Sequence, residues 1–178
     1  MVDRRFGTAG LSLVVAVFLG ACGPHEGGPL VGPREGGRGA EVCVPLGNGQ
    51  SVFFGEPFKN VGSGVVEVVG VSGSGRDLAA LTFTIDTYGP AHGEVIGGFS
   101  WPSTESDDSE AAVLARMVAP QGTQIQPGDT VTLLMQISPT PNARDAVLSE
   151  TSVEYTVDGK VYQETSPVSY RLHVDAQC

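Results

Sequence analysis

The chain has 178 residues, enough for one domain with accessory segments, and 40% of them are hydrophobic while 17% are charged. Its 20 acidic residues outnumber its 10 basic ones, and setting aside the residues before position 41 leaves 17 acidic and 6 basic residues. A surface this negative repels phosphate backbones and anionic lipid headgroups. It therefore excludes nucleic-acid binding and membrane attachment through basic patches.

The first 22 residues have the pattern of an export signal. Arg4 and Arg5 precede a compact apolar run at residues 11–19, which is too short for a permanent membrane-spanning helix. The run ends in Leu19-Gly20-Ala21-Cys22, which resembles the lipobox of bacterial lipoproteins. The resemblance implies that residues 1–21 are removed and that acyl chains on Cys22 hold the protein in the lipid bilayer of the cell membrane, facing the extracytoplasmic side. An ordinary secretory signal that happens to carry a cysteine there is the alternative.

Residues 23–40 contain seven glycines, three prolines and no periodic apolar pattern. Such a composition buries too little surface to offset the entropy lost on ordering. We therefore expect residues 22–40 to form the lipidated cysteine and a flexible tether, with His25 solvated, and residues 41–178 to form the folded domain.

Two cysteines, Cys43 and Cys178, lie at the two ends of the expected domain. Because disulfides persist in exported proteins, we predict a bond between them. In the chain-entropy model, a bond that closes so long a loop contributes about 5 kcal/mol. A pair of free or metal-binding thiols is the alternative.

Short apolar and alternating segments separated by turn residues predict a series of β-strands. Residues 109–118 are ambiguous, because Ser109 followed by Glu110 also fits the start of a short helix. The expected strands, in chain order, are residues 42–46, 51–54, 65–71, 81–85, 94–100, 131–137, 153–157, 160–162 and 168–174.

The clearest local signal is Asp158-Gly159 between two alternating segments, which predicts a two-residue hairpin. With Val157 opposite Lys160, Tyr155 lies opposite Tyr162 on one face. The last strand also alternates, so we expect one set of its side chains to face the core and His173 to face the solvent: Val168, Tyr170, Leu172 and Val174 form the core-facing set.

Seven to nine such strands favour an all-β sandwich of two sheets. Asn60-Val61-Gly62-Ser63-Gly64 before one strand and Pro127-Gly128-Asp129 before another resemble immunoglobulin-like accessory domains of bacterial surface proteins. The resemblance implies an immunoglobulin-like antiparallel β-sandwich that presents loops or an edge to partners, and it carries over no catalytic residues.

The sequence contains no signature of a catalytic or cofactor site. The hydrolase pattern G-x-S-x-G fails because Gly73 is followed by Ser74, and no dinucleotide-binding glycine pattern opens a helix. We predict no enzymatic activity and no cofactor. A copper site would draw on His92, Met117, Met135 and His173, but core packing accounts for both methionines, so we predict no metal ligands.

The segment from Phe99 to Glu110 holds the remaining functional candidates. Its acidic residues lack the ligand spacing of a calcium loop: Glu105, Asp107, Asp108 and Glu110. Trp101 either packs in the core or, if exposed, contacts a partner. The sequence thus favours a non-catalytic module that binds an unknown protein or cell-wall component. The alternative is a lipoprotein that carries a metal, such as copper, or a small solute.

Overall fold

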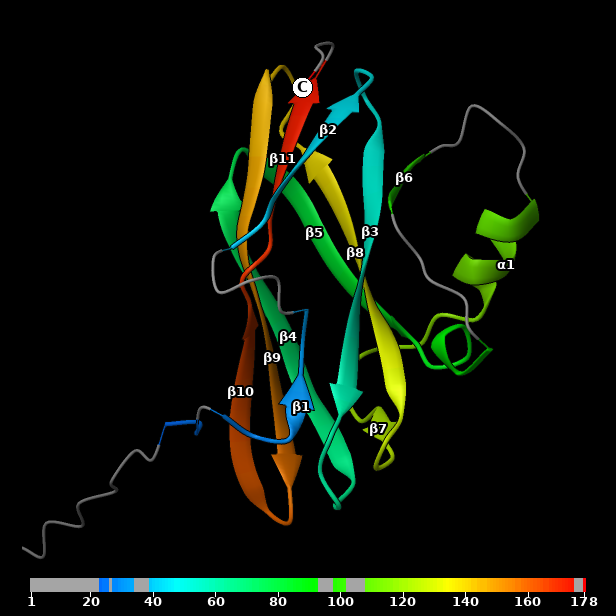
Figure 1. The fold of residues 1–178 in the computed structure, drawn as a ribbon. Coiled ribbons are helices and arrows are strands. Elements are labelled where there is room, and N and C mark those ends of the chain that lie inside the picture. Colours follow the sequence, from blue (N-terminus) through cyan, green and yellow to red (C-terminus); the bar gives the residue numbers. More distant parts are fainter. Residues whose placement is uncertain (1–22, 26, 34–38, 93–97, 102–107, 175–177) are drawn as a thin grey trace, which may run out of the picture.

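The computed structural model describes residues 23–25, 27–33, 39–92, 98–101, 108–174 and 178. Within these residues the chain forms eleven strands, one short α-helix and one 3-10 turn, and the strands make two sheets that face each other (Figure 1). The predicted all-β sandwich of two sheets is confirmed. All nine expected strands are present, although residues 94–97 of one lie outside the described residues. The two strands that were not expected, β1 and β7, are each two residues long.

The first sheet has the order β1-β3-β8-β5, and β6 pairs with the early part of β3. Every strand pair in it is antiparallel. The chain bounds of its strands are β1 Leu30–Val31, β3 Ser51–Asn60, β5 Leu78–Asp86, β6 Gly98–Trp101 and β8 Thr130–Pro139.

The second sheet has the order β2-β11-β9-β4-β7, and β10 pairs with the later part of β9. Its pairs are antiparallel except that β2 and β11 run parallel, so the sandwich is not purely antiparallel. The bounds are β2 Glu41–Leu46, β4 Val66–Arg76, β7 Gln124–Ile125, β9 Asp145–Val157, β10 Lys160–Ser166 and β11 Ser169–Val174.

Alternation along the strands sends apolar side chains between the sheets. Phe58, Met135 and Leu148 are almost fully buried there. The last strand follows its predicted pattern at Val168, Tyr170 and Leu172, which are buried, whereas Val174 at its end is only half-buried. The hairpin is also confirmed, with Lys160 opposite Val157 and Tyr162 opposite Tyr155. Asp158 and Gly159 both have positive φ, as a type I′ turn requires.

The two turn motifs behind the immunoglobulin-like resemblance bind each other. Asn60 is fully buried, and its backbone exchanges hydrogen bonds with the second motif: Asn60 N donates to Asp129 O, and Gly128 N donates to Asn60 O. Its side-chain amide donates to the carbonyls of Gly64 and Ile125. One asparagine therefore joins the turn before β4 to the turn before β8.

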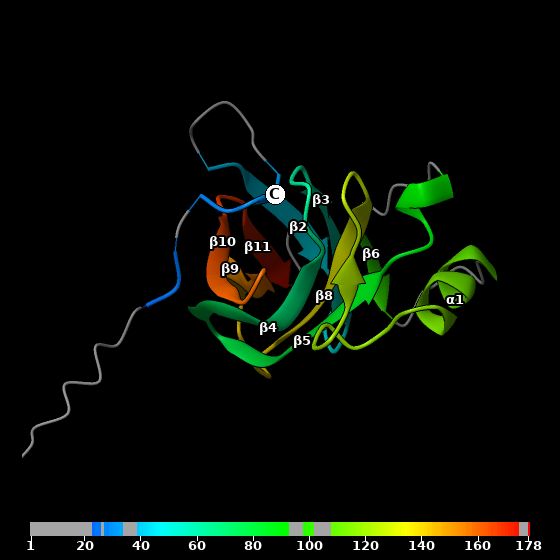
Figure 2. The same cartoon turned by 90° about the horizontal axis from the view of Figure 1, so that it is seen from below.

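Phe53 and Leu134 point to the outer face of the first sheet, where other side chains must shield them from water. Helix α1 (Asp108–Ala115) lies outside this face, and its residues Val113 and Leu114 pack on the pair (Figure 2). The ambiguous segment is thus helical as far as Ala115. Burying the apolar pair is the physical reason that a helix lies here.

The N-terminal segment differs from the predicted tether. Leu30 is fully buried in the core, its N–H donates to the Tyr155 hydroxyl at 3.2 Å, and β1 pairs with the end of β3. His25 is exposed, but its backbone bonds to Val161 and Gln163 of β10. The sandwich therefore begins near His25 rather than at residue 41, while residues 34–38 lie outside the described residues.

Glycine explains how the N-terminal segment can pack against the sandwich although its composition is that of a linker. A Cβ on Gly28 would lie 2.2 Å from the Tyr155 hydroxyl oxygen and 2.7 Å from the Tyr162 ring, so only glycine lets the backbone pass this close. The same residues that raise the entropy of the unfolded segment permit its contact with the two tyrosines.

Candidate functional site

The two ends of the sandwich carry different groups (Figure 1). At one end, which we call the anchor end, lie β1 and the Asp158-Gly159 hairpin. At the other, the disulfide end, lie the loops at residues 47–50 and 140–144 and the carboxyl end of β11. The disulfide, the His173–Asp145 pair and the Arg171–Glu41 pair lie toward the disulfide end.

The predicted disulfide is present. Cys43 lies on β2 and is bonded to Cys178, with 5.9 Å between the two Cα atoms. Because β2 and β11 pair in parallel, Cys43 lies opposite Arg171 in the register. The bond therefore fastens the chain beyond β11 to the neighbouring strand at the edge of the second sheet.

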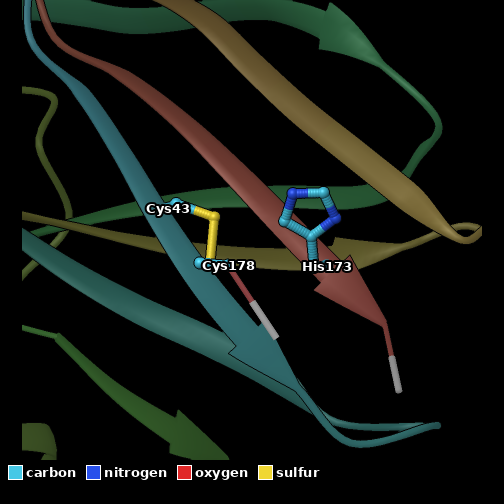
Figure 3. A group of neighbouring side chains, drawn as sticks. All are labelled: Cys43, His173 and Cys178. Atoms are coloured by element: carbon cyan, nitrogen blue, oxygen red, sulfur yellow. A yellow bond between two sulfur atoms is a disulfide. The ribbon is translucent and has the colours of Figure 1, made fainter. Parts of the chain in front are cut away.

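His173 lies beside this bond. Its Nδ1 is 2.5 Å from Asp145 Oδ1. We predicted that His173 faces the solvent, but its side chain is half-buried. One ring nitrogen of His173 and the two sulfur atoms all lie within 4.8 Å of one another (Figure 3). The arrangement brings two sulfurs, an imidazole and a carboxylate to one place.

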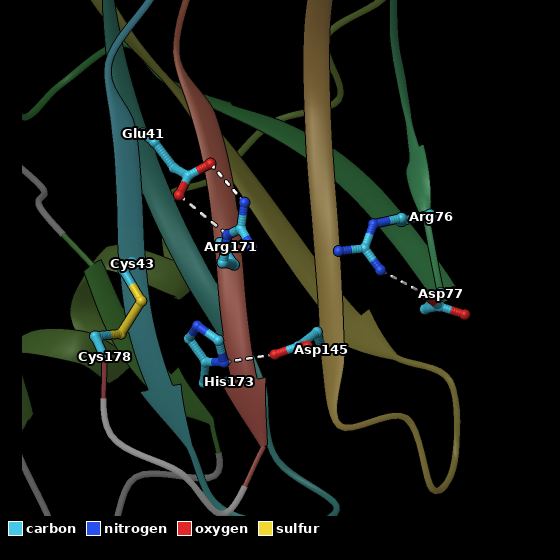
Figure 4. Close-up of polar contacts among 8 residues, drawn as sticks. All are labelled: Glu41, Cys43, Arg76, Asp77, Asp145, Arg171, His173 and Cys178. Carbon is cyan, nitrogen blue, oxygen red and sulfur yellow. Dashed lines mark hydrogen bonds and ion pairs between the residues drawn. A yellow bond between two sulfur atoms is a disulfide. The ribbon is translucent and has the colours of Figure 1, made fainter.

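A second ion pair flanks the histidine on the same sheet (Figure 4). Arg171 donates from Nε and from an Nη to the two carboxylate oxygens of Glu41, at 3.0 and 2.9 Å. The hydrogen bond from Arg171 lowers the pKa of the Glu41 carboxyl, and the same contact raises the pKa of Arg171. Both side chains are exposed, so this pair fixes the local charge pattern more than it stabilises the fold.

A hollow of about 580 Å³ opens next to His173 and Asp145. Asn48, Asn142 and Arg144 also line it, which gives it amide and guanidinium groups for hydrogen bonds. A second hollow, of about 310 Å³, continues over the loops at residues 47–51 and 138–143. The sequence reasoning did not identify this surface, although the Gly and Asn residues of both loops are turn signals that mark where loops lie.

Trp101, the predicted partner contact, is the last residue of β6 and pairs with Ser51 of β3. Ser51 lines the second hollow, so the backbone of Trp101 lies at the disulfide end. The Trp101 side chain lies outside the described residues, and its contact role stays a prediction. The same holds for lipidation of Cys22, because residues 1–22 are not described.

The four candidate copper ligands lie in four different surroundings. Met135 is fully buried between the sheets, where it accepts a hydrogen bond from Thr151 Oγ1. Met117 packs under α1, and His92 is exposed, with its ring stacked on Tyr88. His173 alone lies at the disulfide end. Of the acidic segment, Glu105 and Asp107 lie outside the described residues, while Asp108 and Glu110 are part of α1.

Comparison with solved structures finds likenesses at low sequence identity. No family model matches the sequence, and no curated protein matches it. Among solved structures, the PapD-like domain 7 of human CEP192 matches with a TM-score of 0.44 at 10% identity, over 84% of this chain and 87% of that domain. The CooA pilin subunit of enterotoxigenic Escherichia coli matches with a TM-score of 0.38 at 12% identity, over 83% of this chain and 99% of the pilin.

The Vibrio cholerae VesB protease matches with a TM-score of 0.42 at 13% identity, over 82% of this chain. This chain spans only 32% of the protease chain. Likenesses at these TM-scores do not assign a family or an activity. Within the described residues, no helix is both long enough and apolar enough to cross a membrane.

Proposed function

We propose that this chain is a membrane-anchored, extracytoplasmic lipoprotein that acts as a non-catalytic binding module at the cell surface. The Cys43–Cys178 disulfide is the observation that carries the proposal, because such bonds persist in oxidising compartments. The bond uses two of the chain's three cysteines, and the third is Cys22 in the lipobox-like sequence. An exported domain with one spare cysteine directly after a signal sequence fits acylation at that cysteine.

The docked N-terminal segment supports a defined orientation at the membrane. Only Gly23 and Pro24 separate Cys22 from His25, whose backbone pairs with β10 at the anchor end. Acyl chains on Cys22 would hold the anchor end close to the bilayer. The thirteen residues of β9 span roughly 43 Å, so the disulfide end would project about that far outward.

The disulfide end has the features of a contact surface for a protein or a cell-wall component. Its open hollow presents the amides of Asn48 and Asn142 and the guanidinium of Arg144. Trp101 ends β6 near the rim, and an indole there would add the large, amphipathic contact area on which binding surfaces rely. We propose that a partner binds here, away from the membrane.

Mass spectrometry of the intact chain from host membranes tests the anchor. We expect a mass that begins at Cys22, carries acyl chains and is two hydrogens short because of the disulfide. Cys22→Ala should lose the acyl chains and leave the membrane fraction. The matched control, Cys43→Ala with Cys178→Ala, should keep them. An unacylated wild-type chain would overturn the anchored-lipoprotein proposal.

Site-specific crosslinking on intact cells tests the contact surface. A photoreactive group at Asn48 should give a defined crosslinked product, and Trp101→Ala should abolish it. The same group at Val161, which is exposed at the anchor end, should not give that product. Equal crosslinking from both positions would contradict a partner site at the disulfide end.

A further inference from the structure

The two cysteines and the histidine of the disulfide end have the composition of a metal site. Cys43, His173 and Cys178 place one ligand atom each within 4.8 Å of the others. A tetrahedral Zn²⁺ site has Zn–S distances of about 2.3 Å and Zn–N distances of about 2.0–2.1 Å, so its ligand atoms lie roughly 3.4–3.8 Å apart. Small side-chain shifts would therefore bring these three atoms to metal-binding distances.

Asp145 orients the histidine for a metal. Its carboxylate accepts from Nδ1 of His173, which leaves Nε2 as the ring nitrogen on which a metal can bind. Figure 4 shows that second nitrogen on the side of the ring that faces the disulfide. A carboxylate, a histidine and a metal in this order form the usual outer support of zinc sites.

The charged side chains around the site carry both signs, and Arg144, which lines the hollow beside His173, is one of the positive ones. Arg171 is the nearest basic side chain on β11, and Glu41 holds its guanidinium through two hydrogen bonds. Asp145 adds a negative charge beside His173. The chain as a whole carries a net charge of −10.

We propose that reduction of the Cys43–Cys178 bond converts the disulfide end into a binding site for one Zn²⁺ ion. A thiol reductant supplies two electrons and two protons: two reductant thiols become one disulfide, and Cys43 and Cys178 become thiols. Zn²⁺ then displaces the two thiol protons and forms two Zn–S bonds, and His173 Nε2 forms a third bond. Water completes the tetrahedron.

The proposal goes beyond partner binding, because it makes the disulfide and the metal mutually exclusive states of one site. Bound Zn²⁺ would occupy both sulfur atoms and so delay their reoxidation. The hollow that shares His173 and Asp145 would then differ between the oxidised and the metal-bound chain.

Titration of the full chain with Co²⁺, a spectroscopic substitute for Zn²⁺, tests the ligand set. After reduction with a phosphine, which adds no thiolate, we expect a thiolate-to-Co²⁺ charge-transfer band that saturates at one ion per chain. The oxidised chain and Cys43→Ser with Cys178→Ser should show no such band. An oxidised chain that gives the same band would overturn the proposal.

Histidine variants separate the proposed site from simple binding by two thiols. His173→Ala should weaken Co²⁺ binding at least 10-fold, and Asp145→Ala should weaken it about 10- to 100-fold, the usual effect of removing an outer support. His92→Ala, a histidine of η1 (Pro90–His92) far from the site, is the control and should bind as the wild type does. If His173→Ala binds as tightly as the wild type, the proposal is wrong.

Thermal unfolding decides whether the folded chain is the species that binds. Zn²⁺ should raise the Tm of the reduced wild type, because an ion that binds only the native state stabilises it. It should raise the Tm of His173→Ala less. An unchanged or lowered Tm for the reduced wild type would mean that the ion does not bind the native chain in preference to the unfolded one, and this result would also overturn the proposal.

Discussion

Glu56 is a carboxyl group inside the sandwich. Its side chain is almost fully buried on β3, where Oε1 accepts a hydrogen bond from the Tyr170 hydroxyl at 2.8 Å. Oε2 has no hydrogen-bond partner among the described residues. Burial raises the pKa of Glu56, and the hydrogen bond from Tyr170 lowers it by less. The folded chain therefore holds a proton on this group more tightly than the unfolded chain does.

This linkage predicts how stability depends on pH. A group with a raised pKa stabilises the fold fully below its unfolded pKa, and that contribution is lost as the pH rises through the folded pKa. Glu56→Gln keeps an oxygen for Tyr170 but cannot ionise. As the pH rises from about 4, the wild type should therefore lose stability relative to the variant, and the difference between their free energies of unfolding should shift in favour of Glu56→Gln. Urea denaturation at a series of pH values measures the difference.

Glu67→Gln is the matched control, because Glu67 is exposed on β4. The difference between this variant and the wild type should change little with pH. If Glu56→Gln and Glu67→Gln follow the same pH profile, ionisation of Glu56 does not limit the stability of the fold.

At the level of single residues, the sequence predicted which residues form turns and which apolar side chains are buried, but it did not predict that the acidic side chain of Glu56 is buried. Tyr155 opposite Tyr162 followed from the hairpin register, which depends only on neighbouring residues. Glu56 looked like an ordinary strand residue, because its burial depends on Tyr170, which is 114 positions later in the chain. Contacts of that range leave no local pattern to read.

Among the elements, β4 shows how glycine shapes a strand. The register against β9 shifts twice along it, once between Val68 and Gly70 and once between Ser74 and Gly75. A Cβ on Gly75 would lie 2.0 Å from the Val147 carbonyl oxygen, whereas a Cβ on Gly70 would meet nothing within 4 Å. The second irregularity therefore requires glycine, and the first does not.

The pair of glycines gives a test with its own control. Gly75→Ala forces β4 away from β9 and should lower the free energy of unfolding by about 1–3 kcal/mol, the usual cost of overpacking. Gly70→Ala should be neutral or stabilise the fold by up to about 1 kcal/mol, because alanine restricts the unfolded chain. Chemical denaturation of the two variants measures both effects, and equal destabilisation would contradict the strand geometry.

Sequence patterns predicted the longer elements and missed the short ones. Alternating and β-branched runs identified nine strands, and Ser109 followed by Glu110 allowed a short helix, which in the structure already begins at Asp108. β1 was not expected, because a two-residue strand in a glycine- and proline-rich segment has no periodicity. It forms because Leu30 fills a site in a core that other elements build.

For the whole molecule, the Cys43–Cys178 bond closes a loop with a sequence separation of 135 residues. Removing it through Cys43→Ala with Cys178→Ala should lower the free energy of unfolding by about 5 kcal/mol, since the unfolded chain regains the entropy of that loop. Denaturant unfolding of the variant against the oxidised wild type measures the loss. Cys22→Ala is the control and should leave the midpoint unchanged. A loss below about 1 kcal/mol would show that the bond adds little to the fold.

The candidate site could be predicted only in part. Cysteine counting paired Cys43 with Cys178, which the structure confirms. The neighbours of that pair could not be foreseen, because Asp145 meets His173 only through the pairing of β9 with β11. The copper set that the sequence analysis considered and set aside shares only His173 with this site, and the fold places its members apart.

The parallel pairing of β2 with β11 also affects when the second sheet can finish folding. β2 is one of the first strands to leave a ribosome or a translocation channel, and its edge of the sheet stays open until β11 has followed it. Contacts between such distant segments form slowly, because a long loop must close first. A chain threaded through a membrane pore would thus keep β2 unpaired on this side, and so easy to thread, until β11 had crossed. On the route that we propose for this protein, the topology itself would delay completion of the sheet until β11 has been secreted.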